Sequence, residues 1–161
     1  MNETLSPAPP ALDYLGRLEV HVAAPVEVGH THAGQRRVIP ITGGTFAGPR
    51  GRGQILAAGA DFQLLRTPSE AFLDARYVVA MEDGARLFVT NAAYRTGAVE
   101  DIQALVRGEV VPPERIYFRC APHFEVADTD EGAWGWLSTS IVIGSGQREP
   151  DRVIIDLWVV R

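Results

Sequence analysis

The sequence predicts an all-β fold, a single antiparallel up-and-down β-barrel of about nine to ten strands with one short helix. Three observations support this prediction. Short segments in which apolar and polar residues alternate recur along the chain, Gly or Pro stands in almost every gap between them, and one segment alone has helical spacing. A closed barrel is favoured over a sandwich because closure removes exposed strand edges.

The strand segments follow one another from residue 17 onward. In the first of them, Leu18, Val20 and Val22 alternate with polar neighbours, which is the period of a half-buried strand. Further strands are expected at 36–42, 53–57, 60–66, 70–81, 85–91, 115–120, 134–143 and 152–160.

A tight hairpin is predicted at Asp83-Gly84, which stands between the apolar runs ARYVVAM and ARLFVTN. Glycine accepts the positive φ that a two-residue turn requires. The strands at 70–81 and 85–91 are therefore expected to pair antiparallel.

The one helical segment lies near residues 99–107. Val99, Ile102, Leu105 and Val106 recur at helical spacing, and Gly108 follows as a stop signal. We expect this helix to cover an open end of the barrel.

Length and charge bound the domain organisation. The 161 residues favour one barrel domain over 12–161, preceded by a flexible arm over 1–11 that is rich in Pro, Ala and Ser. The net charge of -5 disfavours binding of nucleic acid or of an anionic membrane surface by bulk charge, and all fifteen basic residues are Arg.

Cellular location is read from the same composition. Cys120 is the single cysteine, so no intrachain disulfide can form, and the N-terminus lacks the cationic start and apolar run of a signal peptide. No stretch has the length of a membrane span. The expectation is a cytoplasmic protein.

Asp61 and Gln63 share one face of their strand, opposite Phe62 and Leu64. If that face looks into the barrel, Asp61 is a buried acid with a raised pKa, usable as a general base or acid. If it looks outward, both residues are merely solvated. The sequence leaves the two readings open.

Arg76 and Arg119 are the candidate oxyanion ligands. Each lies within a strand segment, and a guanidinium inside a barrel can hold a carboxylate or a developing enolate through two hydrogen bonds. The alternative is a purely structural ion pair with Asp74 or Glu125.

His123 and Glu125 alternate within YFRCAPHFE and can form an acid/base pair, although Pro122 makes the register there uncertain. His30 and His32 form a second His-x-His pair without a third ligand nearby in the sequence, and a surface loop is expected for them. A competent site needs three or four ligands, so no metal is expected.

Other motifs point to structure more than to chemistry. The run GPRGRG at 48–53 lacks the flanking strand and helix of a phosphate loop and is read as turn and bulge glycines. No G-x-S-x-G is present, and Cys120 has no context that would lower its thiol pKa. Tyr77, Phe118 and Trp136 are expected in the core or as substrate-binding residues that line a pocket.

Taken together, six segments resemble the bacterial and fungal family known as domain of unknown function 3237, or UPF0311. The resemblance runs from about Gly43 to Val160 and is carried by GGTFAGPRGRG, GADFQ, LDARYVV with its following DG turn, YFRCAPHFE, WGWLSTSIVIGSG and VIIDLWVV. It implies a lipocalin-like or calycin-like barrel with a central cavity, and an association with small-molecule catabolism or secondary metabolism.

The family positions that the resemblance carries over are Asp61, Arg76, Arg119, Glu125 and Trp136. The chain departs from the family pattern around the aspartate, where Ala58-Gly59-Ala60 replaces Gly-Gly and Phe62 replaces Trp, and at Ser138, where Asn is common.

The expected function is therefore a cofactor-independent enzyme of the lyase, isomerase or cyclase type. It would act on a small, mostly apolar molecule (aromatic, phenolic or polyketide-like) by proton transfer, with Asp61 as base, Arg76 or Arg119 on the oxyanion, and Glu125 or His123 returning the proton. The alternatives are a non-catalytic carrier of the same fold and a scaffold protein without a cavity. A homodimer is possible, since small barrels commonly associate.

Overall fold

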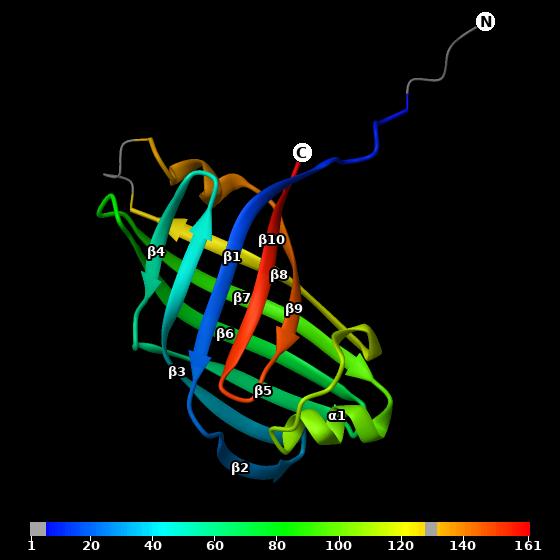
Figure 1. Cartoon of the computed structure of the whole chain (residues 1–161). Helices are drawn as coiled ribbons and strands as arrows, with labels where there is room; N and C mark the ends of the chain where they lie inside the picture. Colours follow the sequence, from blue (N-terminus) through cyan, green and yellow to red (C-terminus); the bar gives the residue numbers. More distant parts are fainter. Residues whose placement is uncertain (1–5, 128–131) are drawn as a thin grey trace, which may run out of the picture.

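The computed structural model describes residues 6–127 and 132–161 and contains a closed antiparallel barrel (Figure 1). Eight strands form the ring, and two further strands and one α-helix are added to it. The strands are β1 (Leu12–Val22), β2 (Val26–Thr31), β3 (Gly34–Gly48), β4 (Gly51–Ile55), β5 (Gly59–Thr67), β6 (Glu70–Met81), β7 (Arg86–Gly97), β8 (Ile116–Val126), β9 (Val142–Arg148) and β10 (Arg152–Val160). The predicted fold class is confirmed.

Pairing between the first and third strands closes the ring. β1 lies antiparallel to β10 on one side and to β3 on the other, for example through the pair Leu18 and Phe46. β4 and β5 share the place between β3 and β6, because each pairs with a different half of those two long strands. All these pairings are antiparallel. Most strands that are neighbours in the barrel are also consecutive in the chain.

The predicted antiparallel hairpin between β6 and β7 is confirmed, but its loop has three residues (82–84) instead of two, because the Met81 amide donates a 2.8 Å hydrogen bond to the Ala85 carbonyl. Ala80 faces Arg86 across the last strand pair, and the Gly84 amide donates a 3.0 Å hydrogen bond to the Met81 carbonyl. Gly84 has a φ of 94°, which a residue with a side chain adopts only with strain.

The strand predicted over 134–143 is wrong in its first half. A short 3-10 helix, η2 (Gly135–Thr139), occupies that segment, and β9 begins at Val142. Trp134 and Leu137 are both buried, and a spacing of three places them on the same side of a 3-10 turn. The apolar run therefore covers one end of the barrel instead of extending its wall.

α1 (Val99–Val106) confirms the predicted helix and lies at the opposite end of the barrel from η2 (Figure 1). Ile102 and Leu105 are buried, as the helical spacing requires. A second short 3-10 helix, η1 (Pro113–Arg115), precedes β8.

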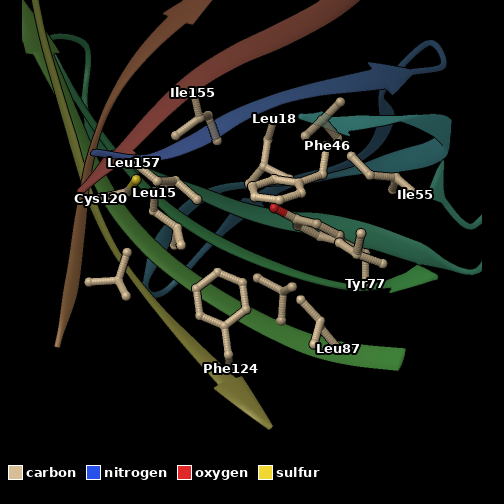
Figure 2. Packing of buried hydrophobic residues seen from close by; sticks show 14 of the residues in the cluster. Leu15, Leu18, Phe46, Ile55, Tyr77, Leu87, Cys120, Phe124, Ile155 and Leu157 are labelled. Atoms are coloured by element: carbon tan, nitrogen blue, oxygen red, sulfur yellow. The ribbon is translucent and has the colours of Figure 1, made fainter. Parts of the chain in front are cut away.

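The core fills the half of the barrel nearer η2. Figure 2 shows Phe46, Tyr77, Leu87 and Phe124 pointing into it from four different strands. Burial of such side chains contributes roughly 1.5–3 kcal/mol each. Large side chains thus close this half, and the polar inward-facing residues belong to the half nearer α1.

Two further sequence predictions concern the arm and the membrane. Residues 6–11 of the predicted arm are exposed and belong to no helix or strand, although Ala11 exchanges two backbone hydrogen bonds with Arg161; residues 1–5 lie outside the described part. Within the described residues, no helix is long and apolar enough to cross a membrane.

Candidate functional site

A cavity lies inside the barrel, between the packed core and α1. About 40 Å³ is open to the centres of water-sized molecules, which is room for a few waters or one thin chemical group. Its polar lining consists of Asp61, Gln63, Tyr77, Asn91, Arg95 and Arg148, and its apolar lining of Val20, Val22, Ile39, Ile41, Leu73, Ala75, Ala93, Phe118, Val153 and Ile155.

Asp61 faces this cavity from β5, while Phe62 beside it points outward and is 40% exposed. The Gln63 Nε2 donates to Asp61 Oδ2 at 2.7 Å, and the backbone N–H of Asp74 donates to Oδ1 at 3.2 Å. Burial nevertheless raises the pKa of Asp61, because these hydrogen bonds and the charge of Arg95 offset the loss of hydration only in part. A carboxyl group in this state can exchange a proton with a bound molecule.

Arg95 is the buried cation that acts on Asp61 most directly. It comes from β7 and is 3% exposed, and its guanidinium carbon lies 5.9 Å from the centre of the Phe118 ring. Burial lowers the pKa of Arg95 to about 10, and the charge of Asp61 works in the opposite direction. Arg95 therefore stays protonated at neutral pH, and it lacks an ion-pair partner within 4.0 Å among the described residues.

Several buried polar atoms around the cavity have no hydrogen-bond partner within the described part of the chain. They are Gln63 Oε1, the Tyr77 hydroxyl, Asn91 Oδ1 and Arg95 Nε. Leaving such atoms unpaired costs roughly 1–3 kcal/mol each. These atoms converge on one cavity, where enclosed waters or another polar molecule can supply the missing partners.

Four sequence candidates line this cavity: Asp61, Gln63, Tyr77 and Phe118. The cavity is also lined by three residues that were not predicted from the sequence: Asn91, Arg95 and Arg148. β7 runs to Gly97 instead of ending at residue 91, and the alternation of Val89, Asn91, Ala93 and Arg95 is the signal that places Asn91 and Arg95 on one face. Arg148 ends β9, beyond the strand predicted over 134–143.

The placement of Arg76 in the cavity is corrected by the structure. Its side chain is 57% exposed on the outer face of β6 and lies 3.2 Å from the Asp74 carboxylate. The inward positions of this strand belong to Leu73, Tyr77 and Val79. Arg76 thus forms the structural ion pair that was the alternative reading.

Arg119, His123 and Glu125 also lie outside the cavity, on the exposed face of β8. Phe118 and Phe124 occupy the buried face, and strand alternation then forces the three polar residues outward. Arg119 stacks over Tyr117 at 5.4 Å and donates to the Phe118 carbonyl. These residues do not meet Asp61.

Trp136 lies in η2, near the other end of the barrel, and is not among the residues that line the cavity. The guanidinium carbons of Arg50 and Arg161 lie 4.7 Å and 5.5 Å from the centre of its ring. Its position therefore suits a structural role at the barrel end, where cation–π contacts cover the ring.

The histidines are dispersed. The surface loop predicted for His30 is wrong, because His30 lies in β2, whereas His32 does lie in an exposed turn, before β3. His21 belongs to β1, and His123 to the outer face of β8. Within residues 6–127 and 132–161, no three His, Cys, Asp or Glu side chains come together as a metal site would require.

Cys120 is buried on the inner face of β8. Burial raises the pKa of its thiol to about 11, and the Asn91 side chain and the Arg119 charge, which act in the opposite direction, have smaller effects. The thiol is therefore protonated at neutral pH, which disfavours a role as nucleophile.

The amino-acid sequence is similar to a family of known proteins. A family described as "Protein of unknown function (DUF3237)" matches residues 10–160. A UPF0311 protein of Bradyrhizobium diazoefficiens is 41% identical over 153 residues, which cover 94% of this chain and 98% of that protein.

Solved structures show the same barrel. A conserved protein of unknown function from Rhodopseudomonas palustris superposes with a TM-score of 0.87 at 36% identity, over 98% of this chain and all of the other. A protein of Penicillium herquei described as an enzyme shares the fold at 18% identity, with a TM-score of 0.70 over 98% of each chain.

Proposed function

The chain belongs to the DUF3237 family, also named UPF0311, and we propose that it is a cofactor-independent enzyme that moves a proton on a small, mostly apolar molecule. One observation carries this proposal. A half-buried carboxyl group, whose pKa desolvation raises, and a buried guanidinium face the same largely apolar cavity. Such pairs of groups with environmentally altered pKa values are typical of acid/base sites.

The roles follow from the chemistry of the side chains. Asp61, once ionised, takes a proton from a carbon beside a carbonyl group, and the electron pair of that C–H bond moves into the carbonyl to give an enolate. Arg95 stabilises the oxygen that becomes negative, because a charge in a dry site is stabilised best by a fixed opposite charge. Asp61 then returns the proton to another atom of the same molecule, which completes an isomerisation and leaves the enzyme unchanged.

Cyclisation and elimination need the same first step. In cyclisation, the enolate carbon attacks a second carbonyl carbon of the molecule, and the alkoxide that forms takes the proton from Asp61. In elimination, the enolate restores its carbonyl and forms a C=C bond as the leaving group departs from the adjacent carbon, and the leaving group takes that proton. These reactions share Asp61 and Arg95 and differ in what the bound molecule carries. The unpaired oxygens of Tyr77 and Asn91 are available to orient the substrate.

The distant relative from Penicillium herquei gives coarse support. That protein is described as an enzyme and shares the barrel, so the fold accommodates catalysis in at least one other sequence. Its 18% identity carries no residue roles to this chain.

A carrier protein of the same fold is the second candidate. It is favoured by the unpaired polar atoms around the cavity, because these would orient a bound molecule whether or not a reaction follows. Turnover separates the two candidates.

The first prediction tests Asp61 through hydrogen exchange. In D₂O, the protein should catalyse deuterium uptake at the acidic CH₂ group of phenylacetone or phenylpyruvate, followed by NMR. Asp61→Asn keeps the volume but removes the base, so the catalysed rate should fall roughly 10²- to 10⁴-fold. Asp13→Asn, which changes an exposed carboxylate paired with Arg161 and far from the cavity lining, is the matched control and should retain the rate.

Two results would contradict the enzyme proposal. One is exchange no faster than in buffer with both compounds. The other is a catalysed rate that Asp61→Asn leaves unchanged while circular dichroism shows both proteins folded.

A further inference from the structure

A depression on the surface at the α1 end of the barrel adjoins the inner cavity. It measures about 310 Å³ and is bordered by the end of β1, the last turn of α1 and the β9–β10 turn. Val22 and Arg148 line both the depression and the cavity. The two spaces therefore meet at these side chains, which form the boundary between the surface and Asp61.

Arg37 stands in this depression with few partners for its charge. It comes from β3 and is 3% exposed, and its Nη1 donates to the Val106 carbonyl of α1 at 3.3 Å. Among the described residues it forms one ion pair, with Glu27 at 3.5 Å, and the Glu27 side chain is 52% exposed. Arg37 Nε has no hydrogen-bond partner in the described part of the chain. Solvated Glu27 thus compensates the buried guanidinium only weakly.

Arg148 is the second guanidinium of the depression. Its Nη1 donates to the Arg152 carbonyl at 3.2 Å, and no carboxylate of the described residues lies within 4.0 Å of it. Burial and the positive charge of Arg37 both lower the pKa of Arg148, while Asp61 and Asp151 act against them more weakly. Two cations therefore lie near each other with their charges incompletely balanced.

The remaining charged side chains of the depression compensate the two guanidinium groups only weakly. Arg107 also lines the depression but is paired with Glu109, and Asp151 is the one carboxylate among the described lining residues. Buried charges are normally paired, since leaving one uncompensated is costly. The arrangement is that of a site whose missing partner is an anion.

We propose that Arg37 and Arg148 form an anion-binding subsite that holds the carboxylate of the substrate at the entrance of the cavity. Guanidinium groups bind carboxylates through paired, charge-assisted hydrogen bonds. The apolar remainder of the molecule then extends inward past Val22 toward Asp61 and Arg95. This inference rests on the proposed function, because it names a substrate. It specifies the substrate class as small monocarboxylates with an apolar body.

The test compares a carboxylate with its neutral analogue. Phenylacetate and phenylacetamide have nearly the same shape, and their binding to the whole protein is measured by calorimetry at low salt. Phenylacetate should bind at least about tenfold more tightly than phenylacetamide, and its affinity should fall with added salt. Inorganic phosphate is titrated in parallel to represent a simple ion.

Arg148→Gln should weaken phenylacetate binding about tenfold or more and leave phenylacetamide binding unchanged. Arg148→Lys, which keeps the charge, should restore part of the loss. Arg86→Gln is the matched control, because Arg86 is exposed on the same strand as Arg95 but outside the cavity. Arg148 is preferred to Arg37 for substitution, since Arg37 also holds the end of α1.

Three results would overturn the subsite: no phenylacetate binding, equal binding of phenylacetate and phenylacetamide, or phosphate binding as tight as that of phenylacetate. Asp61→Asn separates the two proposals. If it loses exchange but still binds phenylacetate, both stand. If wild-type protein exchanges deuterium but does not discriminate the two ligands, the function stands and the subsite fails. If the wild type prefers phenylacetate, Arg148→Gln loses that preference and no deuterium exchange occurs, the subsite stands and the protein is a carrier of anions.

Discussion

Asp61 shows how one residue links the stability of the barrel to its chemistry. Burial favours the protonated carboxyl group and so raises its pKa in the folded state. An acid of this kind stabilises the fold fully below its unfolded pKa, at about 4. That contribution is lost as the pH rises through the folded pKa, because the folded state then holds a buried charge.

We therefore expect Asp61 to destabilise the folded state increasingly as the pH rises. The Tm of the wild type minus that of Asp61→Asn should decrease from about pH 4 to pH 8. The substitution also removes the attraction between Asp61 and Arg95. Because the pKa of Arg95 is about 10, Arg95 keeps its charge over this pH range and does not itself make the Tm difference depend on pH. Thermal denaturation of both proteins across this range provides the measurement, and a difference that is flat or grows with pH would contradict the buried-acid assignment.

At the scale of secondary-structure elements, one carboxylate connects the β6–β7 hairpin to the segment that covers the barrel end. Asp83 Oδ2 accepts a 2.8 Å hydrogen bond from the indole N–H of Trp134, and Oδ1 accepts one from the Ala85 amide. Trp134 is 2% exposed, so its N–H has no ready access to water. Asp83 therefore orders both the turn and the covering segment.

Asp83→Ala should lower the free energy of unfolding by about 1–3 kcal/mol, because it leaves the buried indole N–H unpaired. Denaturant unfolding followed by tryptophan fluorescence measures the loss. Asp13→Ala, which removes a surface ion pair with Arg161, should cost less than about 1 kcal/mol. Combining Asp83→Ala with Trp134→Phe should cost less than the sum of the single changes; strict additivity would refute the coupling.

At the scale of the whole molecule, the barrel combines a packed apolar core with a cavity whose few polar side chains include Asp61 and Arg95. The four histidines lie outside that cavity, on β1, on β2, on the turn after β2 and on the outer face of β8. We therefore expect dialysis against EDTA to leave both the Tm and the deuterium exchange rate unchanged, since a bound metal would need three or four converging ligands. Loss of either property, with recovery on adding one equivalent of zinc or iron, would disprove this expectation.

Local patterns in the sequence determined the fold class, the Asp83-Gly84 hairpin and α1. Strand alternation, helical spacing and the DG turn each involve only a few neighbouring residues, so these elements can be predicted without knowledge of the rest of the chain. The same alternation put Asp61 and Gln63 on one face of β5 and kept Arg76 opposite Tyr77 on β6. The outward position of Arg119, His123 and Glu125 on β8 could also be predicted from the sequence, because these residues alternate with Phe118 and Phe124.

Which face of each strand lies inside, and which residues meet there, was decided only by the tertiary structure. A period of two separates the faces of a strand, but barrel closure selects the inner one. A polar inner face such as that of Asp61 and Gln63 has the same pattern as a solvated outer face. Arg37, Arg95 and Arg148 come from β3, β7 and β9, and nothing local relates them to Asp61. They gather around it because closing the sheet brings residues from distant strands across one narrow interior, where their charges are no longer screened by water.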